Sequence, residues 1–427
     1  MAYMRLHTYA CSNMYILPNV CLFLADPTVF TLTLFLYYNL SDMKIVIAPQ
    51  TFKGSISALD AAIAIQAGVL EVLPGAETIL VPVADGGDGT LETLVEGSRG
   101  AIRTASVTGP LGERREANWG ALGDEITAVI EMARTSGLAL VPLDARDPMN
   151  ATTYGLGEAI SAALDEDFRT FIVGIGGSAT NDAGAGMAQA LGAALTDRRG
   201  TILPPGGAAL AQLEHIDLSR LDSRIAESTF MVACDVTNPL TGPEGASAIY
   251  GPQKGATPEM VTELDSALEN FADVVRRDIG LDVETLQGSG AAGGLGGGMV
   301  AFLNAELRAG VDIIMDIVNI ERHLEGADLV VTGEGALDYQ TVYNKAPIGV
   351  AQRARSLGVP VVAIAGTLGD RYELVHEHGI DAALPIPSGP MTLEEASENA
   401  SELITQTTQR MMRLMQTGAK IFGQSSA

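Results

Sequence analysis

The segment GIGGSATND at positions 174–182 combines residue types that bind anions. Glycine backbones adopt positive φ and let N–H groups point at a ligand, while hydroxyl and amide side chains add donors. A helix expected to begin near Asn181 or Asp182 would contribute its positive end. Asp182 could hold Mg²⁺ or accept a hydroxyl proton; the alternative is an ordinary tight turn with an N-capped helix. The candidate anion ligands are Gly176, Gly177, Ser178, Thr180 and Asn181.

Two further glycine loops carry charge. TFKGS at 51–55 offers Lys53 as a point charge for phosphate oxygens and Ser55 at the start of a helix. The alternative for this loop is a capping serine beside a solvated lysine. ADGGDGT at 84–90 places Asp85 near Gly86, Gly87 and Asp88, without the spacing of an EF-hand. Its aspartates are candidate ligands of Mg²⁺ or of a hydroxyl group.

Two more segments are ambiguous. CDVTNPL puts Asp235 at the carboxyl end of an expected strand, where a metal ligand is plausible, and we interpret Cys234 as a small buried residue because no histidine accompanies it. GSGAAGG at 288–294 matches G-x-G-x-x-G, but the polar LDVETLQ before it is not a strand. That run could pack on phosphate or on another part of the protein.

Short apolar runs alternate with glycine loops and helical patterns after Met43. This rhythm predicts a parallel sheet covered on both faces, with ligands outside the carboxyl ends of its strands. The expected strands are 44–49, 77–83, 327–333, 360–366 and 380–386, with helices over 57–73 and 90–98. The loops that follow these strands should bring together Lys53, Ser55, Asp85, Gly86, Gly87, Asp88, Glu334, Asp338 and Gln340.

The fold class predicted is α/β, with a Rossmann-like domain interrupted by a second α/β domain. The Rossmann-like domain covers 43–104 and 300–420, the inserted domain covers 105–299, and 421–427 is a tail. The inserted domain contains strand-like runs at 125–133, 171–177 and 230–236. A domain inserted into the first sheet, with a cleft between the two domains, is the simplest topology.

Residues 1–42 are apolar and nearly uncharged, and we exclude them from the fold. One interpretation is a membrane anchor or signal, but Pro18 and Asp26-Pro27 interrupt the apolar stretch. The favoured interpretation is upstream sequence translated from a wrong start, with the true start at Met43.

The charge balance limits the partners. Acids outnumber bases 52 to 26, which argues against nucleic acid and anionic membranes as partners. Three cysteines with neither disulfide nor zinc spacing fit a reducing, cytoplasmic location. A homo-oligomer is left open.

Several enzyme classes lack their motifs here. The sequence has no G-x-x-x-x-G-K-[ST], no protein-kinase motif set, no H-E-x-x-H and no G-x-S-x-G. Carboxylates, a few lysines and anion-binding loops remain, and this inventory suits phosphoryl transfer.

Taken together, the loops resemble the bacterial glycerate kinases that lack a Walker loop, from about Met43 to about Met415. The segments that carry the resemblance are APQTFKGSISA, VPVADGGDGT, ARDPMNATTYGLGE, GIGGSATNDAGAGM, CDVTNPLTGPEGAS, YGPQKGA, GAAGGLGGG and TGEGALDYQTVYNKAPIGVA. The resemblance implies an enzyme that phosphorylates D-glycerate with ATP and Mg²⁺, on the 2-hydroxyl, to give 2-phosphoglycerate.

The roles of individual residues are a hypothesis. Catalysis is expected from Asp182, Lys53 and Asp85, and Mg²⁺ binding from Asp235 or Asp182. Either Asp182 or Asp85 would take the hydroxyl proton, and Lys53 and Lys345 would neutralise the substrate carboxylate or the transferred phosphoryl group. The remaining substrate or phosphate ligands would be Ser55, Gly86, Gly87, Gly176, Gly177, Ser178, Thr180, Asn181, Lys254, Gly293, Gly294, Glu334, Asp338 and Gln340.

The sequence departs from the family at four positions. The family usually has Asp at Gln50, Ser at Thr51, Arg at Ala336 and Gly at Asn344. These departures keep two alternatives open: a kinase for another small hydroxy acid, such as tartronate or an aldonate, and a non-catalytic nucleotide or acid binder. A dinucleotide oxidoreductase rests only on the glycine pattern at 288–293.

Overall fold

The computed structural model describes residues 14–17, 20–23, 34–35, 43–86, 89–343 and 345–424. The chain divides into two compact units. The parallel-sheet unit comprises residues 1–81, 321–339 and 351–427, and the mixed-sheet unit comprises 82–320 and 340–350. The first unit is therefore interrupted in sequence by the second. The change-over points differ from the expected 104/105 and 299/300, because residues 90–104 form a helix and an edge strand of the second sheet.

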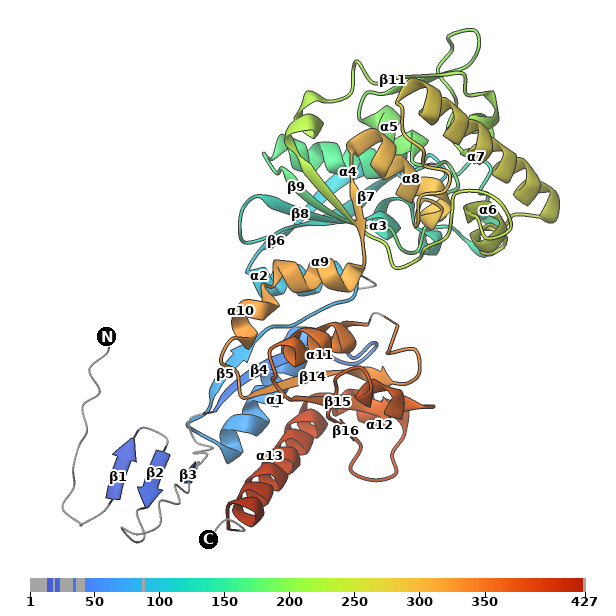
Figure 1. The fold of residues 1–427 in the computed structure, drawn as a ribbon. Helices are drawn as coiled ribbons and strands as arrows, with labels where there is room; N and C mark the ends of the chain where they lie inside the picture. Colours follow the sequence, from blue (N-terminus) through green and yellow to red (C-terminus); the bar gives the residue numbers. More distant parts are fainter. Residues whose placement is uncertain are drawn as a thin grey trace, which may run out of the picture. The chain divides into compact units, whose positions relative to one another are not determined.

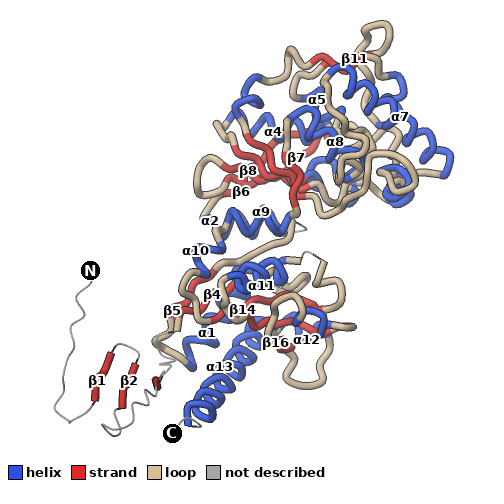
Figure 2. Tube along the Cα trace, in the orientation of Figure 1, coloured by secondary structure: helices blue, strands red, loops and turns tan. Residues whose placement is uncertain are grey.

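The parallel-sheet unit contains five strands in the order β16-β15-β14-β4-β5, and every pair is parallel. Figure 2 shows β5, β4, β14 and β16 of this sheet in red. Apolar runs rich in β-branched residues form the three central strands, β4, β14 and β15, as is typical of parallel sheets that are covered on both faces. The strands are β4 (Lys44–Pro49), β5 (Glu77–Leu80), β14 (Leu329–Leu337), β15 (Val361–Leu368) and β16 (Ala382–Pro385). The second expected strand, 77–83, ends three residues early.

Two helices of this unit, α1 (Ala58–Val72) and α13 (Ala400–Gln424), lie side by side (Figure 1). Apolar side chains of both helices form one core with alternating residues of β4 and β14. The hydroxyl of Ser57, not Ser55, caps α1 by accepting from the N–H of Asp60 at 3.1 Å. The other helices are α10 (Ile320–Leu324) and α11 (Ala346–Ser356), which extend across the change-over points, and α12 (Leu393–Glu398).

The mixed-sheet unit is built on six strands in the order β13-β12-β9-β8-β7-β6. The first four are mutually parallel, whereas β7 and β6 run antiparallel to their neighbours. The strands are β6 (Ala101–Thr108), β7 (Arg114–Ala121), β8 (Thr127–Glu131), β9 (Thr170–Gly174), β12 (Thr229–Ala233) and β13 (Glu306–Arg308). A separate hairpin pairs β10 (Ala194–Thr196) with β11 (His215–Asp217).

Helices pack around this second sheet, and apolar side chains of most of them, from residue 132 to residue 303, join the sheet in one large core. The helices are α2 (Thr90–Ser98), α3 (Met132–Ser136), α4 (Tyr154–Asp165), α5 (Ala185–Ala190), α6 (Ala246–Tyr250), α7 (Pro258–Asp278), α8 (Ala291–Leu303) and α9 (Gly310–Ile317). The helix expected at Asn181 or Asp182 begins instead at Ala185, after Gly184 at φ 74°.

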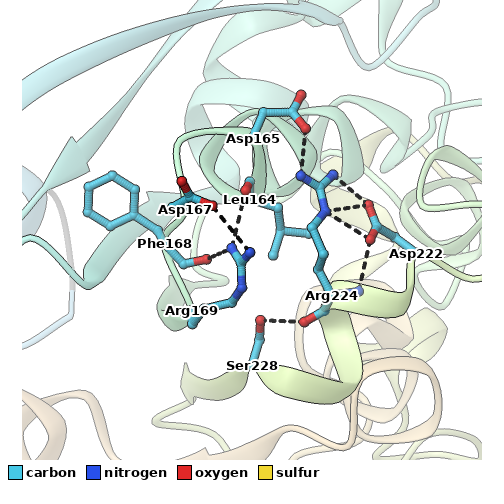
Figure 3. A network of polar contacts seen from close by, with 8 residues as sticks. All are labelled: Leu164, Asp165, Asp167, Phe168, Arg169, Asp222, Arg224 and Ser228. Carbon is cyan, nitrogen blue, oxygen red and sulfur yellow. Dashed lines mark hydrogen bonds and ion pairs between the residues drawn. The ribbon is translucent and has the colours of Figure 1, made fainter.

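A network of polar contacts lies at the end of this sheet where β9 and β12 begin (Figure 3). The guanidinium of Arg224 donates to Asp165 Oδ1 at 2.7 Å and to Asp222 Oδ2 at 2.7 Å. Arg169 donates to the carbonyl oxygens of Leu164 and Phe168. Because β9 and β12 are parallel, the network lies at the opposite end of the sheet from Gly174 and Ala233, which are the last residues of these two strands. The network therefore serves stability rather than chemistry.

Most of the segment 1–42 lies outside the described residues. Its described parts are three short strands, β1 (Met14–Leu17), β2 (Val20–Phe23) and β3 (Leu34–Phe35), in an antiparallel sheet. Gly87, Asp88 and Asn344 also lie outside the described residues. The expected tail is helical as far as Gln424. In the described part of the chain, none of the helices has the length and apolarity needed to cross a bilayer.

Candidate active site

The parallel-sheet unit has a topological switch point between β4 and β14. The chain leaves β4 toward β5 on one side, and it leaves β14 toward β15 on the other. Ligands of open α/β sheets bind at such a point, outside the carboxyl ends of the strands. Lys53 lies in the loop after β4, and Asp338 directly follows β14. The N–H of Gln50 donates to the carbonyl of Gly333 at 2.7 Å and joins the end of β4 to the middle of β14.

The side chains at this switch point differ in exposure. Lys53 is exposed, whereas Glu334, within β14, is only 6% exposed. The Oε1 atom of Gln50 is buried without a hydrogen-bond partner. Ser55 donates its hydroxyl to the carbonyl of Ser397 at 2.9 Å, so this hydroxyl is already engaged within the unit.

The predicted anion loop follows β9 in the mixed-sheet unit. Gly176 and Gly177 are exposed, and Gly177 has φ 71°. The flanks of the loop are anchored: the carbonyl of Gly177 accepts from Leu138 N at 2.8 Å, and Ala179 N donates to Ser136 O at 3.0 Å. The two glycines are thus a short exposed bend held by a rigid strand-like frame, as an anion cradle requires.

Asp182 is buried, at 1% exposure, and its carboxylate is engaged within the same unit. Its Oδ2 atom accepts from the N–H and hydroxyl of Thr153 at 2.8 and 2.9 Å and from Gly186 N at 3.3 Å. Its Oδ1 atom accepts from Gly184 N at 3.3 Å. Burial raises the pKa of Asp182, although these donors oppose the shift. The geometry is that of a structural anchor for the loop.

Lys254 lies beneath the same loop and is 1% exposed. Its Nζ atom donates to the carbonyl oxygen of Thr180 at 2.6 Å. Burial lowers its pKa to about 7, and the negative charge of Asp182 opposes that shift. Asn181 is also buried and donates from Nδ2 to Ser247 Oγ at 3.0 Å. Two acceptors here, Thr180 Oγ1 and Asn181 Oδ1, are buried without a partner.

Gly293 and Gly294 are buried against the same segment. The carbonyl of Gly293 accepts from Ala183 N at 3.1 Å. A Cβ atom on Gly293 would lie 2.0 Å from the Thr180 carbonyl oxygen, so only glycine permits this approach. No strand precedes this run at 281–290, so the dinucleotide-binding pattern lacks its structural context.

Carboxylates gather beside the strand ends of this unit. The Oδ1 atom of Asp235, two residues after β12, accepts from Gly310 N at 2.9 Å. Burial raises the pKa of Asp235, and the negative charges of Asp85 and Asp312 raise it further. A Cβ atom on Gly86 would lie 3.9 Å from Asp235 Oδ2 and 3.3 Å from Ala233 Cβ. Asp85 and Gly86 therefore lie against the end of β12.

These carboxylates do not form a complete metal centre. Over the described residues, no group of three or more His, Cys, Asp or Glu side chains is arranged to hold a metal ion. A kinase Mg²⁺ needs only one or two carboxylates, because phosphates and water complete its shell. The mutual repulsion around Asp235 is the environment that a divalent cation relieves.

Gln340 and Lys345 belong to the mixed-sheet unit. Gln340 is exposed, and Lys345 lies at the start of α11, where its carbonyl accepts from Ile348 N at 3.0 Å. Lys53, Ser55, Glu334 and Asp338 belong to the parallel-sheet unit. Convergence of these two sets stays a prediction.

The sequence analysis did not predict two residues that donate hydrogen bonds to the candidate carboxylates. Thr153 bonds Asp182 across 29 residues, and Gly310 bonds Asp235 across 75. A Thr before a helix and a Gly at a helix start are common, so neither carried a local signal. Their roles depend on contacts between distant segments.

The fold and the site define an α/β protein with an exposed glycine bend and acidic side chains at the ends of parallel strands. The chain matches the sequence model of the Glycerate kinase family over residues 45–416 and belongs to that family. It is 52% identical to the glycerate kinase of Bacillus subtilis (strain 168), over 86% of this chain and 96% of that protein. It is 48% identical to the glycerate 2-kinase of Escherichia coli (strain K12), over 89% of this chain and 100% of that protein.

A solved structure agrees. The crystal structure assigned to glycerate kinase 2 from Salmonella typhimurium LT2 aligns with a TM-score of 0.81 and 49% identity, over 88% of this chain and 99% of that chain. The predictions of a two-domain α/β fold and of a kinase enzyme are confirmed.

Proposed function

We propose that this protein transfers the γ-phosphoryl group of ATP to the 2-hydroxyl of D-glycerate, with Mg²⁺, and releases 2-phosphoglycerate. The observation that carries the proposal is the exposed Gly176–Gly177 bend at the end of β9, in a chain of the Glycerate kinase family. The 48% identical relative named glycerate 2-kinase supports the choice of hydroxyl.

The Gly176–Gly177 bend is the proposed binding site of the nucleotide phosphates. Backbone N–H groups at positive φ bind phosphate without carrying charge, so they suit a protein of net charge −26. Ser178 follows the exposed bend and is itself buried. Positioning and charge neutralisation account for most of the catalysis of phosphoryl transfer, and a rigid loop supplies the first of these.

Asp235 is the proposed ligand of Mg²⁺. Its carboxylate oxygens are donors that this ion prefers, and its repulsion from the nearby charge of Asp85 is reduced when a cation is present. The bound ion would neutralise charge on the phosphate oxygens. Asp182 was expected to share this role, but its four hydrogen bonds make it a positioning residue in this proposal.

The remaining groups act on the acceptor. Asp85 is the proposed acceptor of the hydroxyl proton, which leaves late in a loose transition state and needs only a weak base. Lys53 and Lys345 neutralise the carboxylate of glycerate or the transferred phosphoryl group. Glu334, Asp338 and Gln340 are the proposed polar contacts of the substrate.

The test is ATP consumption by the purified full chain with a panel of acceptors: D-glycerate, L-glycerate, tartronate and no acid. We expect ADP release with Mg²⁺ and D-glycerate well above the other acids. Faster turnover of tartronate than of D-glycerate would show that the substrate is another hydroxy acid. ADP release that is independent of any acid would contradict the proposal.

A further inference from the structure

Lys254 reaches the anion loop from its buried side. Its ammonium group bonds Thr180 O across 74 residues, at 2.6 Å, while the side chain is 1% exposed. The exposed bend that meets solvent is Gly176–Gly177, a few residues earlier. A group this deeply buried does not present its charge to a ligand at the surface of the bend, as sequence reasoning expected it to do.

The energetics of this lysine argue against a role in stability alone. Removing an ammonium group from water costs several kcal/mol, and a single carbonyl bond with one nearby carboxylate offsets only part of it. Burial lowers the pKa of Lys254 to about 7, which reflects that cost. An ammonium has three donors, and one of them is accounted for by Thr180.

The contacts around Lys254 indicate that this side chain fixes the position of the Gly176–Asp182 segment. Asp182 ties the far end of the segment to Thr153, and Gly293 accepts from Ala183. The carbonyl of Thr180 lies between these anchors and the exposed bend, and Lys254 is its side-chain donor. The Nζ–Thr180 bond therefore holds the segment between the bend and Asp182 in place.

We propose that Lys254 is a positioning residue that holds the Gly176–Asp182 segment in the shape that binds nucleotide phosphates, without touching the nucleotide itself. The inference rests on the proposed function, because it takes the bend as the binding site of the phosphates. Loss of the Nζ–Thr180 bond should lower affinity for ATP while leaving the binding of glycerate unchanged.

The experiment compares Lys254→Met, which removes the donor, with Lys254→Gln, which keeps an N–H. Arg224→Met is the matched control, because it also replaces a cation by methionine, at the opposite end of the same sheet. Steady-state kinetics give KM for ATP and for D-glycerate, calorimetry gives the affinity for ADP, and thermal unfolding gives Tm.

We expect Lys254→Met to raise KM for ATP and weaken ADP binding by about tenfold or more, since small displacements of a binding group have effects of this size. KM for glycerate should not change, and Lys254→Gln should recover part of the loss. Arg224→Met should lower Tm without changing either KM. Wild-type ADP affinity in Lys254→Met, or an equal loss in Arg224→Met, would overturn the inference.

Failure of the proposed function gives a different result. If the wild-type chain consumes no ATP with D-glycerate, the choice of substrate is wrong, but ADP binding still distinguishes Lys254→Met from Arg224→Met. A wild-type chain that binds no ADP would remove both proposals.

Discussion

The carboxylate of Asp182 is bonded twice to one residue, Thr153: its Oδ2 atom accepts from the backbone N–H at 2.8 Å and from the hydroxyl at 2.9 Å. This pair joins the start of α4 to the end of the glycine-rich segment 174–182 inside the mixed-sheet unit. The hydroxyl of Thr153 also accepts from Met187 N at 3.0 Å, so the junction extends into α5. Asp182 thus connects three segments through one side chain.

Asp182→Asn should destabilise the protein more than it slows the chemistry. An amide has one acceptor oxygen, so buried donors of Thr153, Gly184 or Gly186 lose their partner, at about 1–3 kcal/mol each. Urea unfolding measures the loss, and kcat on the remaining folded protein measures the chemistry. If Asp182 were the base, kcat would fall by about 100-fold or more with stability retained.

Asp235→Asn should raise the Mg²⁺ concentration needed for half-maximal activity by about tenfold or more, because one charged ligand is lost. The matched control is Asp273→Asn on α7, where the aspartate side chain is 73% exposed and forms an ion pair with Arg276 at the surface. Activity is titrated with MgCl₂ at saturating ATP. Equal Mg²⁺ curves for the Asp235 variant and the wild type would remove Asp235 from the metal site.

Lys254 should make stability rise with pH above neutrality. The pKa is about 7 in the folded chain against 10.5 as its ordinary value, so between these pH values the unfolded chain holds a proton that the native chain has released. The free energy of unfolding should then increase by up to about 1.4 kcal/mol per pH unit relative to Lys254→Met. Urea titrations of both proteins from neutral pH to pH 10 measure this difference. A constant difference across that range would show that Lys254 keeps an ordinary pKa.

Lys53→Met should raise KM for glycerate or lower kcat, because an exposed cation at the switch point is lost. Lys420→Met, on the exposed face of α13, is the control. Both variants are expected to unfold at the temperature of the wild type. Wild-type kinetics in the Lys53 variant would place this lysine outside the site.

The sequence predicted the strands and the loops that follow them, because apolar runs such as 44–49 and the glycines after them are local signals. It placed the start of α1 at the wrong serine, since Ser55 and Ser57 are equivalent as local caps and only tertiary contacts separate them. It also placed the start of α5 at Asn181 or Asp182, because the buried carboxylate resembles an N-cap in sequence.

The sequence predicted which residues are candidates for the site, but it could not assign a role to each of them. Asp182 and Asp235 have the same chemistry in sequence, and only Thr153 and Gly310, far along the chain, distinguish an anchored carboxylate from one beside other charges. Likewise, the sequence predicted Gly293 as a phosphate ligand. In the structure this position needs a glycine because any side chain would collide with the carbonyl oxygen of Thr180. The reducing location and the oligomeric state stay predictions.

The most direct test of the account is the product formed by the full chain from ATP and D-glycerate with Mg²⁺, examined by ³¹P–¹H correlation NMR. The account predicts a stoichiometric phosphate ester whose phosphorus couples to the single proton on C2. Phosphorus coupled to the two protons on C3, or no phosphate ester while ATP and D-glycerate persist, would contradict it.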